Sequence, residues 1–506
     1  MCLGCCLDFP LFRRLRGKTP NDLDSITMPF PFTLPTTSHL TFQTHLLCST
    51  HPSLPSSATS IRSVLRSTLK VHKRLPESQQ PSNLRSVNTA LLAYLPYLLT
   101  IDAALSGKPV AGEDVDIALA SELEVEWRPT LSASAVPGRD AARVKGRGLD
   151  YEIYSVVSML AILQSLLARD SILSLYASTV PTPEQRLGFI QNATKAISTA
   201  NAVNSYLQAR SNSADSAPSI PSTAVDLSPT VQAALQSYTL AETTLLFVLK
   251  DDPYPALLAQ ARNKNDKEWM IKAPEISKVR AHLLARLCLS ASEHAGRTLA
   301  SLKSDGGKVS KEFVGYCEDL RSAAQAKACR FFGLDADVSG KTGEAIAWLH
   351  AGLNEVGLEI PNQSSKSSFS MSKLKNSLSE KREERLLAKG KGKWGADAGK
   401  AEEGRILEWL EKRWSKMNDT MNVQIVPEWR ELAKNMPSGR DMPTSAAWTP
   451  PLLDDDELAR MRAPPEVNIV DDESSGDEDL ADQERPRPNK TPGSFPGDDS
   501  QGGSYY

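Results

Sequence analysis

Apolar residues recur every three or four positions along most of this chain, first between residues 61 and 71 and again between 84 and 98. This spacing gathers side chains on one face of an α-helix, so it predicts a series of amphipathic helices. Short turns separate them, and we therefore expect neighbouring helices to pack antiparallel. Further helices are predicted at 183–211, 228–250, 252–263, 274–303, 308–332 and 342–357.

Two stretches depart from this period. After Gly148 the sequence YEIYSVVSMLAILQSLLARDSILSLYAS is apolar nearly all round, which predicts a helix buried at the centre of a bundle or solenoid. Earlier, ELEVEWRPTL alternates apolar and polar residues around Val125 and Trp127 and ends at Pro129. That alternation predicts a short strand, so we expect an all-α solenoid that carries a small β-sheet.

The pattern changes again near both ends of the periodic region. PFPFTLPTT, after Met28, holds three prolines and predicts an extended lead-in. Residues 361–400 are rich in Ser, Lys and Gly and predict a flexible insertion. Residues 454–506 are acidic and rich in Pro, Gly and Ser, so we expect a disordered acidic tail. Between insertion and tail, the seam of a helix that docks on the body is predicted at Leu407, Leu410, Trp414 and Met417.

The first 27 residues have two interpretations. Cys2, Cys5 and Cys6 stand beside arginines, without a secretory hydrophobic region or cleavage site. Acylation of these cysteines is one interpretation. We favour the other, in which 1–27 is a dispensable extension and the folded module spans 28–453.

The composition limits the classes of protein to which this chain can belong. Only 6% of the residues are aromatic, while 40% are hydrophobic and 24% charged, and the formal net charge is −3. A chain without basic excess is not expected to bind nucleic acid. Local basic runs at Arg62 to Arg74 and Lys373 to Lys393 are either solvated faces or contacts with an anionic membrane. Seven cysteines without a framework spacing favour a reducing cytoplasm, and the best apolar run, Ala90 to Leu105, is too short to span a membrane.

Candidate chemistry is sparse. Gly340, Lys341 and Thr342 match the end of a phosphate-binding loop, but Asp335 stands where that loop needs glycine. We expect a turn between helices with Thr342 as the N-cap, and we keep a nucleotide-binding enzyme only as the least favoured alternative. No histidine or cysteine spacing predicts a metal site or an activated nucleophile, so neither a cofactor nor an enzymatic activity is expected.

Four strings resemble one known family: MPFPFTLPTT at 28–37, VEWRPTLS at 125–132, VKGRGLDYE at 144–152 and MPSGRDMP at 436–443. They are similar to the fungal PalC family of pH-response regulators, which carry a BRO domain like that of Alix. The resemblance implies a curved, tetratricopeptide-like helical solenoid of the BRO type.

The resemblance also implies a function. Family members act as adaptors in ambient-pH (Pal/Rim) signalling, where a calpain-like protease processes a zinc-finger transcription factor. The expected partners are the amphipathic C-terminal helix of an ESCRT-III subunit and other Pal or Rim components. The expected location is the cytoplasm, with recruitment to cortical sites at the plasma membrane or to endosomes. A constitutive endosomal-sorting factor is the alternative.

Residues are carried over from the family by position. The ESCRT-III helix would contact an apolar patch, with Tyr238 the best candidate because its ring can be buried while its hydroxyl stays wet. Arg440, in MPSGRDMP, is either an interaction residue or part of a structural salt bridge. Ser474 and Ser475, before an acidic run, are candidate phosphorylation sites. The patch comprises Val203, Leu235, Tyr238, Ile346 and Leu349.

Overall fold

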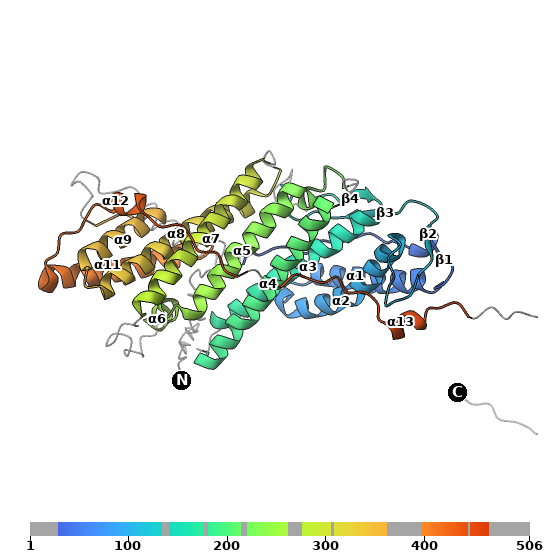
Figure 1. Cartoon of the computed structure of the whole chain (residues 1–506), viewed down its shortest axis with the longest axis horizontal. Coiled ribbons are helices and arrows are strands. Elements are labelled where there is room, and N and C mark those ends of the chain that lie inside the picture. Colours follow the sequence, from blue (N-terminus) through green and yellow to red (C-terminus); the bar gives the residue numbers. More distant parts are fainter. Residues whose placement is uncertain are drawn as a thin grey trace, which may run out of the picture. The chain divides into compact units, whose positions relative to one another are not determined.

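Helices that pack each on the next make up the body of the protein, as the apolar periodicity predicts (Figure 1). From α1 to α5 each helix packs on its successor, α5 then packs on α7, and the series continues through α8 and α9 to α11. Such neighbour-to-neighbour packing defines a helical solenoid. The helices are α1 Leu54–Arg74, α2 Gln80–Leu105, α3 Leu149–Leu173, α4 Pro183–Ser213, α5 Pro229–Asp251, α6 Tyr254–Ala261, α7 Lys278–Ser304, α8 Lys311–Val338, α9 Thr342–Glu355, α11 Lys400–Met417, α12 Trp429–Lys434 and α13 Asp455–Ala459.

The computed structural model describes residues 29–133, 141–176, 181–213, 220–261, 276–304, 308–361, 397–443 and 446–464. The predicted extension 1–27, nearly all of the predicted insertion and most of the predicted tail lie outside these ranges. Ser474 and Ser475 lie outside them too.

Consecutive helices run antiparallel where cross-helix hydrogen bonds record their direction. On α4 and α5, Gln236 bonds Ser205, while three residues further along α5 Thr239 bonds Asn201, four residues earlier on α4. Ser228 caps α5 by accepting a hydrogen bond from the Val231 N–H.

The tract after Gly148 forms α3, and every residue from Tyr151 to Leu163 is buried. Helices α2 and α3 are long and apolar enough to cross a bilayer, yet 61% of the apolar window of each is buried inside the fold. That burial is typical of core helices. The prediction of a central buried helix is confirmed.

Two antiparallel ribbons supply the β-structure. β1 Leu46–Cys48 pairs with β2 Ile117–Leu119, and β3 Glu124–Trp127 pairs with β4 Val144–Arg147. The predicted strand around Val125 and Trp127 is therefore β3, and both side chains are buried as the alternation requires.

The extended segments at either end of the described chain lie against the helices. After α12 the chain passes α4, where Trp448 meets Tyr206, and then α2, where the Leu453 N–H bonds the Thr100 hydroxyl (Figure 1). The ordered chain continues past the predicted boundary at 453, because Leu458 and Met461 are also buried. The structure divides into units between 463 and 464.

One local prediction is corrected at the turn between α8 and α9. Lys341, not Thr342, occupies the N-cap position, and no side chain caps this helix. The Thr342 hydroxyl instead accepts a hydrogen bond of 2.7 Å from the Asn422 amide. The partner of Thr342 lies 80 positions away in the sequence. Local capping rules consider only nearby residues, so they do not predict this contact.

Candidate partner-binding surfaces

The apolar patch carried over by family position is not a surface in this structure. All five side chains are at most 3% exposed, so a docking helix cannot touch them as the fold stands. Their helical spacing marks the core face, which apolar helical residues most often occupy. The prediction of an exposed patch is therefore corrected for Val203, Leu235, Tyr238, Ile346 and Leu349.

The surroundings of Tyr238 explain its burial. Its hydroxyl accepts a 2.8 Å hydrogen bond from the Phe30 N–H, and its ring packs edge-on against Phe32 and Phe313. The proline-rich lead-in therefore occupies the place that was predicted for a partner. A tyrosine hydroxyl expected to stay wet is instead satisfied by the chain's own backbone.

Glu242 lies fully buried one turn along α5 from Tyr238. Tyr316 donates a hydrogen bond of 2.5 Å to its Oε1, while its Oε2 is buried without a hydrogen bond. Burial raises the pKa of Glu242 to about 7, although Tyr316 and Arg169 act in the opposite direction. Near neutral pH this carboxyl group thus exists in both protonation states.

Replacing Glu242 by glutamine should stabilise the protein more at pH 8 than at pH 5. The folded-state pKa lies above the unfolded value, so protonation favours folding, and this contribution is lost as the pH rises towards 7. From pH 5 to pH 8 the advantage of Glu242→Gln should grow by about 2–3 kcal/mol. Urea unfolding at both pH values measures it, with the exposed Glu408→Gln as control. An advantage independent of pH would contradict the assignment.

An open groove lies between α4 and α5. It encloses about 300 Å³ and is lined along α4 by Ile190, Thr194 and Lys195, with Phe247 and Lys250 opposite on α5. Gln191 and Ser198 complete the lining. The groove lies on the same two helices as Val203 and Leu235, but those side chains point into the core.

The groove combines an apolar floor with a basic rim. Ile190 is buried at its base and Phe247 is half-buried, whereas Lys195 and Lys250 are exposed. Leu187, one turn before Ile190, is 40% exposed and extends the apolar stripe. An amphipathic helix with acidic residues beside its apolar face matches this pattern.

Sequence reasoning missed this groove because Leu187 continues the core-facing stripe of α4 at the same helical spacing. Ile190, Ala193, Ile197 and Ala200 are buried, whereas Leu187 at the start of the stripe is exposed.

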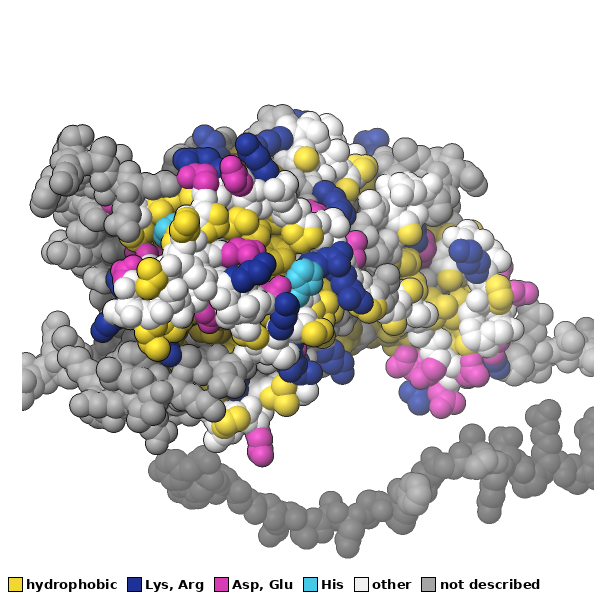
Figure 2. Space-filling view, turned by 60° about the vertical axis from the view of Figure 1, so that its left-hand side comes forward, with side chains coloured by type: hydrophobic (Ala, Val, Ile, Leu, Met, Phe, Trp, Pro, Cys, Tyr) yellow, Lys and Arg dark blue, Asp and Glu magenta, His cyan; other side chains and the backbone are white. Residues whose placement is uncertain are grey.

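A second apolar surface runs along the chain after α11. Met421, Val423 and Ile425 are 77%, 79% and 91% exposed, and they alternate with polar residues that hold the segment in place. Asn422 bonds Thr342, and the Gln424 side chain bonds Gly340 and Gly343. On the face in Figure 2, hydrophobic side chains are likewise interspersed with Lys and Arg.

The loop that carries Arg440 is fixed while Arg440 itself is free. The Arg440 N–H bonds the Arg286 carbonyl, and Asp441 accepts from Ser290 and lies 3.1 Å from the His294 ring nitrogen. A side chain at Gly439 would come within 2.6 Å of the Ser290 backbone, so this close approach needs glycine. The Arg440 side chain is exposed and makes no salt bridge within the described chain, which favours the interaction role over the structural one.

A known protein resembles this chain along nearly its whole length. No family model matches the chain. It is 44% identical, over 503 residues, to the pH-response regulator protein palC of Emericella nidulans, covering 93% of this chain and 99% of that protein. The chain belongs to the PalC family of pH-response regulators.

Solved structures show that this PalC-family chain has the BRO fold. The ALIX BRO1 CHMP4C complex matches with a TM-score of 0.50 and 16% identity, covering 85% of this chain and 98% of that one. An ALIX structure in complex with the SIVmac239 PYKEVTEDL late domain matches with a TM-score of 0.51 and 15% identity, covering 86% and 51%. The predicted helical solenoid of the BRO type is confirmed.

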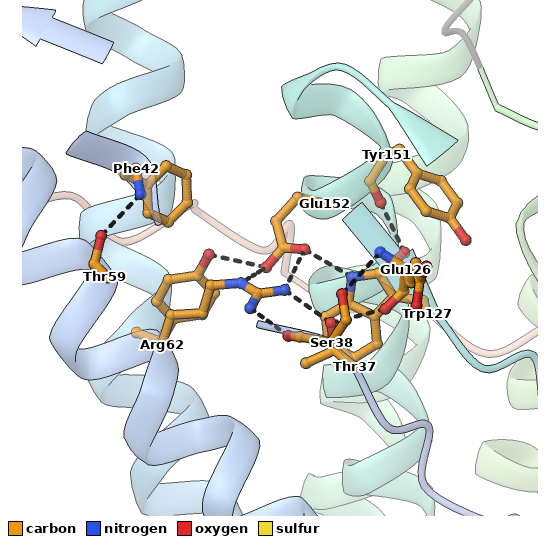
Figure 3. Close-up of polar contacts among 11 residues, drawn as sticks. Thr37, Ser38, Phe42, Thr59, Arg62, Glu126, Trp127, Tyr151 and Glu152 are labelled. Carbon is orange, nitrogen blue, oxygen red and sulfur yellow. Dashed lines mark hydrogen bonds and ion pairs between the residues drawn. The ribbon is translucent and has the colours of Figure 1, made fainter. Parts of the chain in front are cut away.

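Three of the four segments by which the chain resembles the PalC family meet in its core (Figure 3). Glu152 of α3 is fully buried and accepts hydrogen bonds from Arg62 (2.7 Å), Tyr94 (2.9 Å) and Trp127 (2.7 Å). Arg62 also bonds the Thr37 hydroxyl at 2.8 Å, which ties the lead-in to α1. Burial and the negative charge of Glu152 raise the pKa of Tyr94 well above its usual value.

A second buried network joins the other end of this PalC-family fold. Arg330 of α8 forms a two-point contact with Asp252 at 2.6 and 3.2 Å and bonds Glu403 of α11 at 2.5 Å. Lys327 completes the network with a 2.9 Å contact to Glu403. Burial alone would raise the pKa of Asp252, but Arg330 and Lys327 outweigh it and hold that pKa below its usual value. These buried charges join α8, α11 and the C-terminal end of α5.

The Gly340, Lys341 and Thr342 triplet forms the turn between α8 and α9. Gly340 has a φ of 75°, and the Lys341 amine pairs with Glu344 at 3.1 Å on the next helical turn. The geometry is that of the expected helix-to-helix turn.

Proposed function

We propose that this PalC-family chain is a non-enzymatic adaptor of ambient-pH signalling that binds the amphipathic C-terminal helix of an ESCRT-III subunit. The groove between α4 and α5 carries the proposal, because it offers an apolar floor and a basic rim on a helical scaffold. Two similar proteins support it: a relative that is a pH-response regulator, and an ALIX BRO1 domain solved in complex with CHMP4C.

In this role the chain brings components together. The bound ESCRT-III subunit and other Pal or Rim components would assemble with a calpain-like protease, which processes a zinc-finger transcription factor. Assembly would take place at cortical sites on the plasma membrane or at endosomes, with the adaptor recruited from the cytoplasm. Arg440 offers a second contact, because its guanidinium is presented on a rigid loop and matches a carboxylate.

The partner helix would lie along the groove with its apolar face on Leu187 and Phe247. Its acidic residues would meet Lys195 and Lys250, whose exposed ammonium groups steer association and fix the orientation. The apolar anchors should supply most of the affinity, since buried anchors at the centre of an interface dominate its energy.

Replacing Leu187 by aspartate should weaken binding of an ESCRT-III C-terminal helix peptide at least about thirtyfold, equivalent to about 2 kcal/mol, because a charge would enter the apolar contact. Fluorescence anisotropy with the full-length chain measures the affinity. Lys195→Glu with Lys250→Glu should weaken binding in a salt-dependent manner. Arg440→Ala should lower the affinity less than Leu187→Asp does.

Leu92→Asp is the matched control, because Leu92 is 45% exposed on α2, away from the groove. It should leave peptide binding unchanged. Equal losses in both aspartate variants would remove the groove from the proposal, and no binding by the unmodified chain would overturn the partner.

A further inference from the structure

One face of α1 carries a row of cations. Arg62, Arg66, Lys70 and Arg74 follow one another at intervals of four, so they lie on adjacent turns of one side of the helix. Arg62 turns inward and is buried against Glu152, which removes it from the predicted membrane-facing run. The other three lie beyond it along the helix.

Arg143, immediately before β4, joins this row from outside the helix. The pKa of Lys70 is lowered, first by Arg66, then by burial, and further by Arg143 and Arg74. Every charged group that shifts it is a cation. We call Arg66, Lys70, Arg74 and Arg143 the α1 basic cluster.

The cluster has unused hydrogen-bonding capacity. The Nε atoms of Arg66 and Arg143 are buried from solvent and have no hydrogen-bond partner. Nearby cations on β4 differ, since Lys145 and Arg147 both pair with Glu124. No member of the cluster forms a salt bridge in the described chain. Buried donors normally have partners, so the two buried arginine Nε atoms without one, in a cluster of four cations, indicate a missing anion.

An exposed apolar side chain lies next to the cluster on α1. Val71, three residues before Arg74, is 52% exposed. Cations beside exposed aliphatic groups are typical of surfaces that contact an anionic membrane interface.

We propose that the α1 basic cluster binds a multiply phosphorylated inositol, as the headgroup of a membrane phosphoinositide or as a soluble inositol polyphosphate. Guanidinium groups bind phosphate oxygens in a two-point geometry, and adjacent phosphates match several cations spaced along a helix. This site is separate from the α4–α5 groove and goes beyond the adaptor function. It would hold the adaptor at a membrane independently of ESCRT-III.

The test uses the full-length chain and two probes. Co-sedimentation with phosphatidylcholine vesicles containing phosphatidylinositol 4,5-bisphosphate measures membrane binding, with vesicles of equal charge made from phosphatidylserine for comparison. Calorimetry with inositol hexakisphosphate measures binding of the soluble form. Each cation near a membrane surface contributes about fivefold in affinity. The affinity for the vesicles should therefore fall about a hundredfold or more in the triple variant Arg66→Glu with Lys70→Glu and Arg74→Glu. The milder double variant Lys70→Gln with Arg74→Gln should lose less of this affinity.

The control reverses three exposed lysines elsewhere: Lys303→Glu with Lys308→Glu and Lys311→Glu. It should bind like the unmodified chain. Binding of inositol hexakisphosphate alone, lost only in the cluster variants, would identify the soluble form as the ligand. No binding of either probe, equal losses in the control, or equal binding to phosphatidylserine vesicles would overturn the proposal. ESCRT-III peptide binding should be unchanged in the cluster variants.

Discussion

Replacing Glu152 by alanine should lower the free energy of unfolding by about 3–5 kcal/mol, the cost of breaking a buried ion pair. The substitution leaves the Arg62 guanidinium, which is 1% exposed, without its carboxylate. It also removes the acceptor for Tyr94 and Trp127. Urea unfolding followed by circular dichroism measures the change.

Glu124→Ala provides the control, because Glu124 also pairs with cations but on the exposed ribbon, at 41% side-chain exposure. It should cost no more than about 1 kcal/mol. The double replacement Arg62→Met with Glu152→Leu should be less destabilised than Glu152→Ala, since it leaves no buried charge unpaired. A Glu152→Ala protein as stable as Glu124→Ala would contradict the central role of this network.

Replacing Arg330 by alanine should have an effect of similar size, about 3–5 kcal/mol, at the other end of the body. Asp252 and Glu403 would keep only Lys327 as a cation inside the core. The change is measured by urea unfolding at pH 8 and pH 5.

The pH dependence distinguishes a charge effect from lost packing. In the unmodified protein the lowered pKa of Asp252 contributes stability that is present above the unfolded pKa and lost on acidification. Without Arg330, burial dominates and raises the pKa of Asp252. Protonation of Asp252 then removes a buried unpaired charge, so the loss of stability in the variant should be smaller at pH 5 than at pH 8. A deficit equal at both pH values would indicate lost packing alone. Arg430→Ala, at an exposed pair with Glu428, should cost about 1 kcal/mol or less at either pH.

The Glu152 network indicates the structural role of the strings that resemble the PalC family. Thr37, Trp127 and Glu152 come from three of the four strings and meet in one hydrogen-bonded cluster. Gly146 in the third string lies so close to the Tyr151 ring that a side chain would meet it at 2.1 Å. These residues hold the fold together, and the proposed partner contacts lie on surfaces outside the strings, apart from Arg440.

Periodicity determined the helices, because burying one face of each helix requires apolar residues every three or four positions. The seam at Leu407, Leu410 and Trp414 was predicted in this way and is buried. The strand at Val125 and Trp127 followed from alternation in the same manner. These patterns are local, and the backbone geometry that produces them is the same in every protein.

Tertiary structure alone decided which faces remain exposed. Tyr238 and Leu187 both stand on helices with apolar stripes, yet the first is covered by Phe30 and Phe32 and the second faces solvent. In the same way, Arg62 and Arg66 lie on adjacent turns of α1, yet only Arg62 pairs with a buried carboxylate. The spacing of a residue indicates its side of a helix, but what covers that side comes from segments distant in the sequence. The family, the helices and the strand were therefore predictable, whereas the groove and the basic cluster required the packed structure.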